Sequence, residues 1–160
     1  MKILVTGGAG YIGSHTCHLL CNKGYDVVVY DSLENGHKDN LPSNAKLIVN
    51  DLSDIDKLNN CFKENNFDGV IHFAGYIEAG ESMKNPLKFF NNNVVNGLNL
   101  LNVMIKNDVK NIIYSSSAGV YGQPKNIPIK EESEKNPVNY YGLSKLMFEQ
   151  ILNSCKVHGL

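Results

Sequence analysis

Short apolar runs alternate along the chain with longer segments in which apolar residues recur at helical spacing. The apolar runs predict β-strands at about residues 2–6, 26–30, 46–49, 69–73 and 111–115. The helical spacing predicts helices over about residues 11–23, 54–65, 86–107 and 140–157. Residues 31–43 are polar and residues 123–139 contain three prolines, so we expect both stretches to be loops. This alternation predicts an α/β fold, a Rossmann-type doubly wound parallel sheet with helices on both faces.

A glycine-rich turn joins the first predicted strand to the first predicted helix. The apolar run from Ile3 to Val5 is followed by Gly8-x-Gly10-x-x-Gly13. Glycines allow the backbone to approach a pyrophosphate closely, and the N-terminus of the following helix offers N–H groups and the positive end of its dipole. The pattern predicts a nucleotide-phosphate site, and a purely structural turn is the alternative.

An acidic residue, Asp31, ends the second predicted strand about 20 residues after the glycines. A carboxylate at this place hydrogen-bonds the adenosine ribose of a dinucleotide. It would repel the 2′-phosphate of NADP, and neither Ser32 nor Leu33 offers a cation to bind that phosphate. We therefore expect NAD to be the cofactor.

A second group of polar residues follows the fifth predicted strand. Ser115, Ser116 and Ser117 end that strand, and Tyr141 and Lys145 lie four residues apart at the start of the last predicted helix. Residues four apart share a helix face. A free phenol keeps its proton at neutral pH, but a nearby ammonium favours the phenolate. The arrangement suits proton transfer by Tyr141 with Lys145 beside it, although Tyr-x-x-x-Lys alone is common on exposed helix faces.

Together these motifs resemble the extended short-chain dehydrogenase/reductase family, and within it the UDP-glucose 4-epimerases. The resemblance rests on Thr6-Gly7-x-x-Gly10-x-x-Gly13, His72-Phe73-Ala74-Gly75, Asn91-Asn92-Asn93-Val94, the segment 115–122, and the segment 141–152. It covers the whole chain. Ile77 and Gly119 depart from it, since many of these epimerases have lysine and threonine there.

The resemblance implies roles for particular residues. The catalytic residues would be Ser117, Tyr141 and Lys145. The residues contacting NAD would be Gly7, Gly10, Tyr11, Ile12, Gly13, Asp31, Ser32, Asn35, Asp51, Leu52, Phe73, Ala74, Gly75, Asn92, Tyr141 and Lys145. Relatives form dimers through the helices near 86–107 and 140–157, so a homodimer is expected.

Composition and charge limit the other partners. The formal net charge is -1 and charged residues, 19% of the chain, are spread along it, so we expect no nucleic-acid or membrane partner. The four cysteines, Cys17, Cys21, Cys61 and Cys155, have neither Cys-x-x-Cys spacing nor a nearby histidine cluster. We expect reduced cysteines, no metal and a cytoplasmic location.

The function implied is NAD-dependent inversion at C4 of a UDP-hexose, UDP-glucose or UDP-galactose, through a 4-keto intermediate. Two alternatives stay open: another nucleotide-sugar enzyme of the same family, such as a reductase or decarboxylase, and a non-catalytic NAD-binding domain. The chain has 160 residues, and family members are about twice as long. We therefore expect one NAD-binding domain over residues 1–160 that lacks the last strand and the substrate domain.

Overall fold

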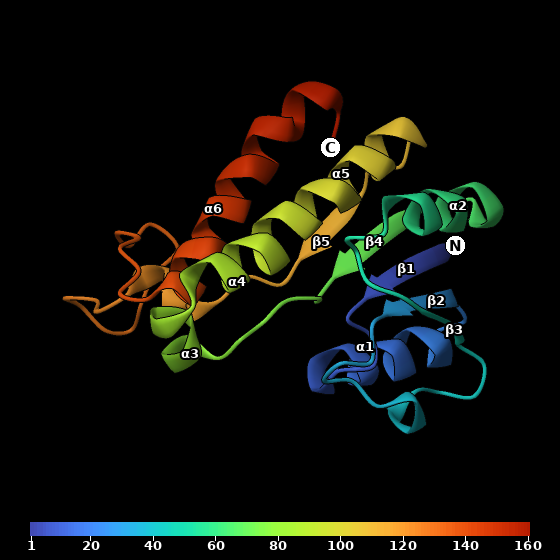
Figure 1. Cartoon of the computed structure of the whole chain (residues 1–160), viewed down its shortest axis with the longest axis horizontal. Coiled ribbons are helices and arrows are strands. Elements are labelled where there is room, and N and C mark those ends of the chain that lie inside the picture. Colours follow the sequence, from blue (N-terminus) through green and yellow to red (C-terminus); the bar gives the residue numbers. More distant parts are fainter. The chain divides into compact units, whose positions relative to one another are not determined.

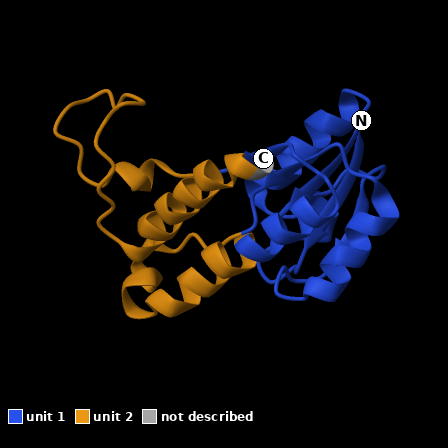
Figure 2. Ribbon diagram, turned by 90° about the horizontal axis from the view of Figure 1, so that it is seen from above, with its two compact units in different colours: residues 1–74, 98–115, 158–160 blue, residues 75–97, 116–157 orange. Residues whose placement is uncertain are grey.

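The computed structural model describes residues 1–160, except for the side chain of His158. Its contacts divide the chain into two compact units (Figure 2). The first unit contains residues 1–74, 98–115 and 158–160, and the second contains residues 75–97 and 116–157. The expectation of one domain over residues 1–160 stays a prediction.

The first unit is built on a five-stranded parallel sheet with the order β3-β2-β1-β4-β5. Its strands are β1 (Lys2–Thr6), β2 (Asp26–Asp31), β3 (Lys46–Val49), β4 (Gly69–His72) and β5 (Ile112–Tyr114). The central strand β1 pairs Ile3 with Val27 on one side and with Gly69 on the other. The strand order reverses direction between β1 and β4, as in a doubly wound sheet.

Helices cover both faces of this sheet (Figure 1). Helix α1 (Tyr11–Asn22) lies on one face, and α2 (Ile55–Asn65) and α5 (Asn96–Lys106) lie on the other. Beneath α1, Cys17 packs in a buried cluster with Ile3, Val5, Val27 and Val29. Apolar side chains on alternate strand positions are buried here because the parallel sheet is covered by helices.

The second unit is helical. It contains α3 (Ala79–Lys84), α4 (Pro86–Phe90), the π turn η2 (Asn91–Val95), the 3-10 turn η3 (Ala118–Tyr121) and α6 (Tyr140–Ser154), which the 3-10 turn η4 (Cys155–His158) extends. Asn139 caps α6, its side-chain oxygen accepting from the Gly142 N–H at 2.7 Å. Gly97 lies so close to the Phe148 ring that a Cβ at position 97 would overlap it.

The structure confirms the predicted strands and long helices to within a few residues, with two additions. The helix predicted over 86–107 is interrupted by the π turn, and the short helix α3 was not predicted. Residues 123–139 contain no helix or strand, as expected, whereas the polar loop 31–43 includes the 3-10 turn η1 (Lys38–Asn40). None of the helices described here is long and apolar enough to span a membrane.

Candidate functional site

In the first unit, the glycine turn connects β1 to α1 and packs closely against neighbouring backbone. Gly7 has φ +69°, a conformation that favours glycine, and its N–H donates to the Tyr30 carbonyl at 3.0 Å. A Cβ on Gly7 would lie 2.5 Å from the Ala74 nitrogen, and one on Gly13 would overlap the Gly7 carbonyl. The turn therefore requires glycine at these two positions.

Gly10 caps α1 without a side-chain hydrogen bond, and the next two residues, Tyr11 and Ile12, have exposed side chains. The first turn of α1 contains no acidic residue. The turn and the helix N-terminus thus have the chemistry of an anion site, and they fit the pyrophosphate of a dinucleotide.

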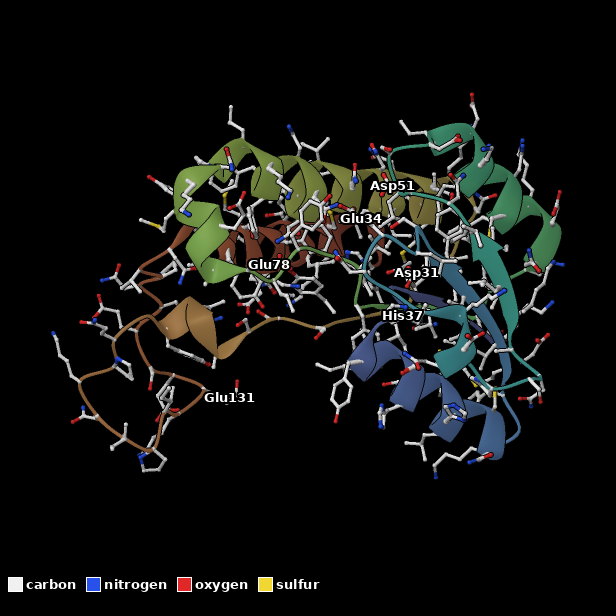
Figure 3. The ribbon with its side chains drawn as sticks, turned by 60° about the horizontal axis from the view of Figure 1, so that its bottom comes forward. Asp31, Glu34, His37, Asp51, Glu78 and Glu131 are labelled. Carbon is white, nitrogen blue, oxygen red and sulfur yellow. The ribbon has the colours of Figure 1, made fainter. Side chains whose placement is uncertain are left out.

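Asp31 lies buried at the end of β2 (Figure 3). Both of its carboxylate oxygens accept backbone hydrogen bonds. Oδ2 accepts from the Ala9 N–H of the glycine turn at 2.9 Å, and Oδ1 accepts from the Leu33 N–H at 2.9 Å. Each oxygen has a further lone pair that can accept from a ribose hydroxyl. Asp31 therefore also fastens the turn to the loop after β2, a role that sequence analysis missed.

The other residues of the first unit expected to contact NAD also follow strands. Ser32 and Asn35 lie in the loop after β2, and Asp51 and the buried Leu52 lie after β3. Asp51 Oδ1 accepts from the Ser53 N–H at 2.8 Å. Phe73 and Ala74 follow β4, and both donate their N–H to the Thr6 carbonyl, at 2.9 and 3.1 Å. The carboxyl ends of parallel strands are where ligands bind in open α/β sheets.

In the second unit, Ser117 and Tyr141 both lie close to Gly119. The Ser117 hydroxyl caps η3 by accepting from the Gly119 N–H at 3.0 Å. A Cβ on Gly119 would lie 3.2 Å from Ser117 Oγ and 3.9 Å from Tyr141 Cε1. A side chain at position 119 would therefore contact both the serine hydroxyl and the tyrosine ring.

Lys145 is buried one turn beyond Tyr141 on α6, with 4% of its surface exposed. Its Nζ lies 6.0 Å from the centre of the Tyr141 ring. Burial lowers the pKa of Lys145 from 10.5 to about 8, so at pH 7 the ammonium is still mostly charged. Gly75 adjoins it: a Cβ there would lie 3.7 Å from Nζ. The second unit therefore brings together Ser117, Tyr141, Lys145 and Gly75.

The π turn holds the backbone that follows Gly75. The Tyr76 N–H donates to the side-chain oxygens of both Asn92 and Asn93, at 3.1 and 2.8 Å. Asn93 Nδ2 donates in turn to the Tyr76 carbonyl and to Ser144 Oγ, each at 3.0 Å. Ser144 Oγ donates to the Tyr141 carbonyl at 2.7 Å. π turns are frequent at functional sites, and this one connects the Gly75 segment to the helix of Tyr141.

Sequence reasoning named Asn92 but missed Asn93 and Ser144, which are both buried. Their only signal was their place within the two segments that carried the family resemblance. Among the described side chains, no group of three or more histidines, cysteines and acids could hold a metal ion. The four cysteines are free thiols.

The chain is similar to known epimerases over almost its whole length. Residues 3–159 match the family described as NAD dependent epimerase/dehydratase family. A UDP-glucose 4-epimerase of Streptococcus mutans is 48% identical over 163 residues, which are 100% of this chain and 49% of that relative. One from Bacillus subtilis is 46% identical over 95% of this chain and 47% of its own length. The chain spans about half the length of these curated relatives.

Solved structures agree with these matches. UDP-glucose 4-epimerase from Brucella ovis, in complex with NAD, superposes with a TM-score of 0.96 at 39% identity, over 99% of this chain and 49% of that one. The Bifidobacterium longum enzyme, in complex with NAD+ and UDP, gives 0.93 at 44% identity, over 98% of this chain and 49% of that one. By sequence and by fold, this chain belongs to the NAD dependent epimerase/dehydratase family.

Proposed function

We propose that this chain is the cofactor-binding part of an NAD-dependent epimerase that inverts C4 of a UDP-hexose, UDP-glucose or UDP-galactose, through a 4-keto sugar. The observation that carries the proposal is the group in the second unit: a buried Lys145 beside Tyr141, with Ser117 and Tyr141 both adjoining Gly119. A non-catalytic NAD-binding domain has no need of this group. The names of the relatives support the choice of substrate.

Each residue of the group has a defined part in the proton transfer. Tyr141 takes the proton of the sugar 4-hydroxyl, because a nearby cation favours its phenolate form. Lys145 supplies that cation and would hold the nicotinamide ribose of bound NAD by donating a hydrogen bond. Ser117 holds the substrate oxygen, since a hydroxyl can donate or accept as the proton moves. When bound, NAD would accept the hydride from C4 and return it to the opposite face of the keto sugar.

The first unit would hold the adenosine half of the cofactor. The pyrophosphate would lie against the N–H groups of the glycine turn and of α1, and Asp31 would accept from the ribose hydroxyls. A second negative charge beside a buried carboxylate is unfavourable, so we propose NAD rather than NADP. Structures of relatives in complex with NAD support this assignment.

Two further parts of the proposal concern the assembly and its location. We propose a homodimer through the helices near 86–107 and 140–157, on which Leu87 and Met147 present exposed apolar side chains. We also propose a cytoplasmic location, which the four free thiols support because cytosolic cysteines are kept reduced.

The test is a chimera in which residues 1–160 replace the matching part of the Bacillus subtilis relative. Purified chimera is mixed with UDP-galactose and NAD, and UDP-glucose is measured over time. The proposal predicts interconversion, which Tyr141→Phe should slow by a factor of about 10² or more while NAD stays bound. A chimera that folds and retains NAD, as an assay of the cofactor released on denaturation would show, but does not interconvert the sugars would overturn it. If UDP-galactose is not converted, turnover of UDP-glucuronate to a decarboxylated sugar, or reduction of a keto sugar with added NADH, would point to a different enzyme of the family.

A further inference from the structure

A second polar group lies in the helical unit, beside the residues of the proposed reaction. Three segments contribute to it: Ser116 before η3, Lys135 in the loop 123–139, and Glu149 on α6. Ser116 Oγ donates to Glu149 Oε1 at 2.5 Å, and Lys135 Nζ donates to Glu149 Oε2 at 2.6 Å. The two oxygens of the Glu149 carboxylate thus accept hydrogen bonds from two different segments of the chain.

Glu149 continues the helix face that carries the proposed chemistry. It lies four residues after Lys145 and eight after Tyr141, so the three side chains project from the same side of α6. Its partner Ser116 is the chain neighbour of Ser117. The Ser116–Glu149 hydrogen bond therefore joins the helix of Tyr141 and Lys145 to the segment that presents Ser117.

This hydrogen bond belongs to the strong kind. Hydrogen bonds to ionised carboxylates are short, about 2.5–2.7 Å for O–H donors, and stronger than neutral ones. The Glu149 side chain is mostly shielded, at 20% exposure, and Lys135 at 39% covers one of its oxygens. The bond to Glu149 raises the pKa of Lys135, which is the sign expected for an ammonium held against a carboxylate.

We propose that Glu149 is a positioning residue, which holds Ser117 at its working distance from Tyr141 by anchoring Ser116, with Lys135 fixing the carboxylate in place. The proposal rests on the proposed function, because Ser117 and Tyr141 act on a sugar hydroxyl only if that function is right. Glu149 itself touches neither substrate nor cofactor. Its removal should change turnover more than binding, since a small misplacement of a reacting group lowers the rate steeply.

The test compares variants of the chimera described above. For each variant, kcat, KM for UDP-galactose and the amount of bound NAD are measured. Glu149→Gln keeps the shape but places an amide against Lys135, and we expect kcat to fall about tenfold or more with KM changed less than about threefold. Ser116→Ala should have a similar effect, and the double variant should be no worse than the poorer single one. Lys135→Ala should lower kcat, and Lys135→Arg should restore it. The control Glu134→Gln alters an exposed glutamate next to Lys135.

A merely structural hydrogen bond would lower the amount of folded protein without separating kcat from KM. Additive effects of Ser116→Ala and Glu149→Gln, or a kcat within twofold of the parent in Glu149→Gln, would overturn the proposal. Amide hydrogen exchange of residues 115–122 gives a readout that does not need activity. Faster exchange in Glu149→Gln than in Glu134→Gln supports the anchoring of Ser116 by Glu149, whether or not the parent is active. A parent that interconverts no sugar would refute only the proposed function. Equal exchange in the two variants would refute the anchor.

Discussion

Replacing Lys145 by methionine should make the chain more stable, and in the chimera the same change should remove the proposed activity. Lys145 is buried on α6 with 4% of its surface exposed. The folded chain disfavours the charged form of Lys145, because burial lowers the pKa of this side chain from 10.5 to about 8. Methionine has nearly the same length and carries no charge to desolvate. Activity should be lost because the cation beside Tyr141 is gone.

The size of the gain follows from the shift in pKa. At about 1.4 kcal/mol for each pKa unit, the ammonium costs the folded state about 3 kcal/mol below pH 8, where both the folded and the unfolded chain are protonated. Between pH 8 and 10.5 the folded chain releases the proton first, so the parent gains stability as the pH rises. The advantage of Lys145→Met should therefore shrink to roughly half its size at pH 9.5 and vanish above pH 10.5.

Urea unfolding of the parent and the variant, followed by circular dichroism at pH 7 and at pH 9.5, measures this difference. Lys106→Met serves as the control, because Lys106 is exposed in the last turn of α5; it should change stability by less than about 0.5 kcal/mol at either pH. A Lys145→Met chain that is less stable than the parent at pH 7, or whose advantage is the same at both pH values, would refute the reasoning.

Three further predictions concern binding and turnover. Asp31→Ala should weaken NAD binding and narrow the preference for NAD over NADP, measured by calorimetric titration; equal affinities of the parent for the two cofactors would contradict the role given to this carboxylate. Tyr141→Phe should lower turnover by a factor of about 10² or more in the chimera and leave NAD bound, and near-normal turnover would mean that another group is the base. The 160-residue chain alone should show no detectable conversion of UDP-galactose to UDP-glucose, because contacts to the UDP group, far from the reacting carbon, are needed to position the sugar. Turnover near that of ordinary enzymes, roughly 1 to 10³ per second, would show that this reasoning is mistaken.

The elements that the sequence predicts well are those with a local cause. Strand β1 and the turn after it could be located because a continuous apolar run and the spacing of glycines are properties of neighbouring residues. Helix α3 was missed because its six residues are too few to show a period and include Gly80. Candidate residues such as Tyr141 and Lys145 could be found because they lie one turn apart on the same helix.

What the sequence did not predict depends on distant contacts. The Ser116–Glu149 hydrogen bond joins residues 33 apart, and the Asn93–Ser144 bond joins residues 51 apart. Neither pair has a spacing that periodicity can detect. The bond of Asp31 to the glycine turn spans 22 residues. Its position was predicted from the needs of a ribose, but its contribution to holding the turn could be seen only in the folded chain.

The π turn at Asn91–Val95 makes the length of this segment as consequential as its composition. A regular α-helix would be reached by deleting one residue, and each residue of a helix advances the side chains by about 100°. The deletion would thus rotate Asn92 and Asn93 away from Tyr76, or turn Gly97 away from the Phe148 ring. The segment should tolerate many substitutions better than the loss or gain of a single residue, even though the shortened helix would have better local hydrogen bonding.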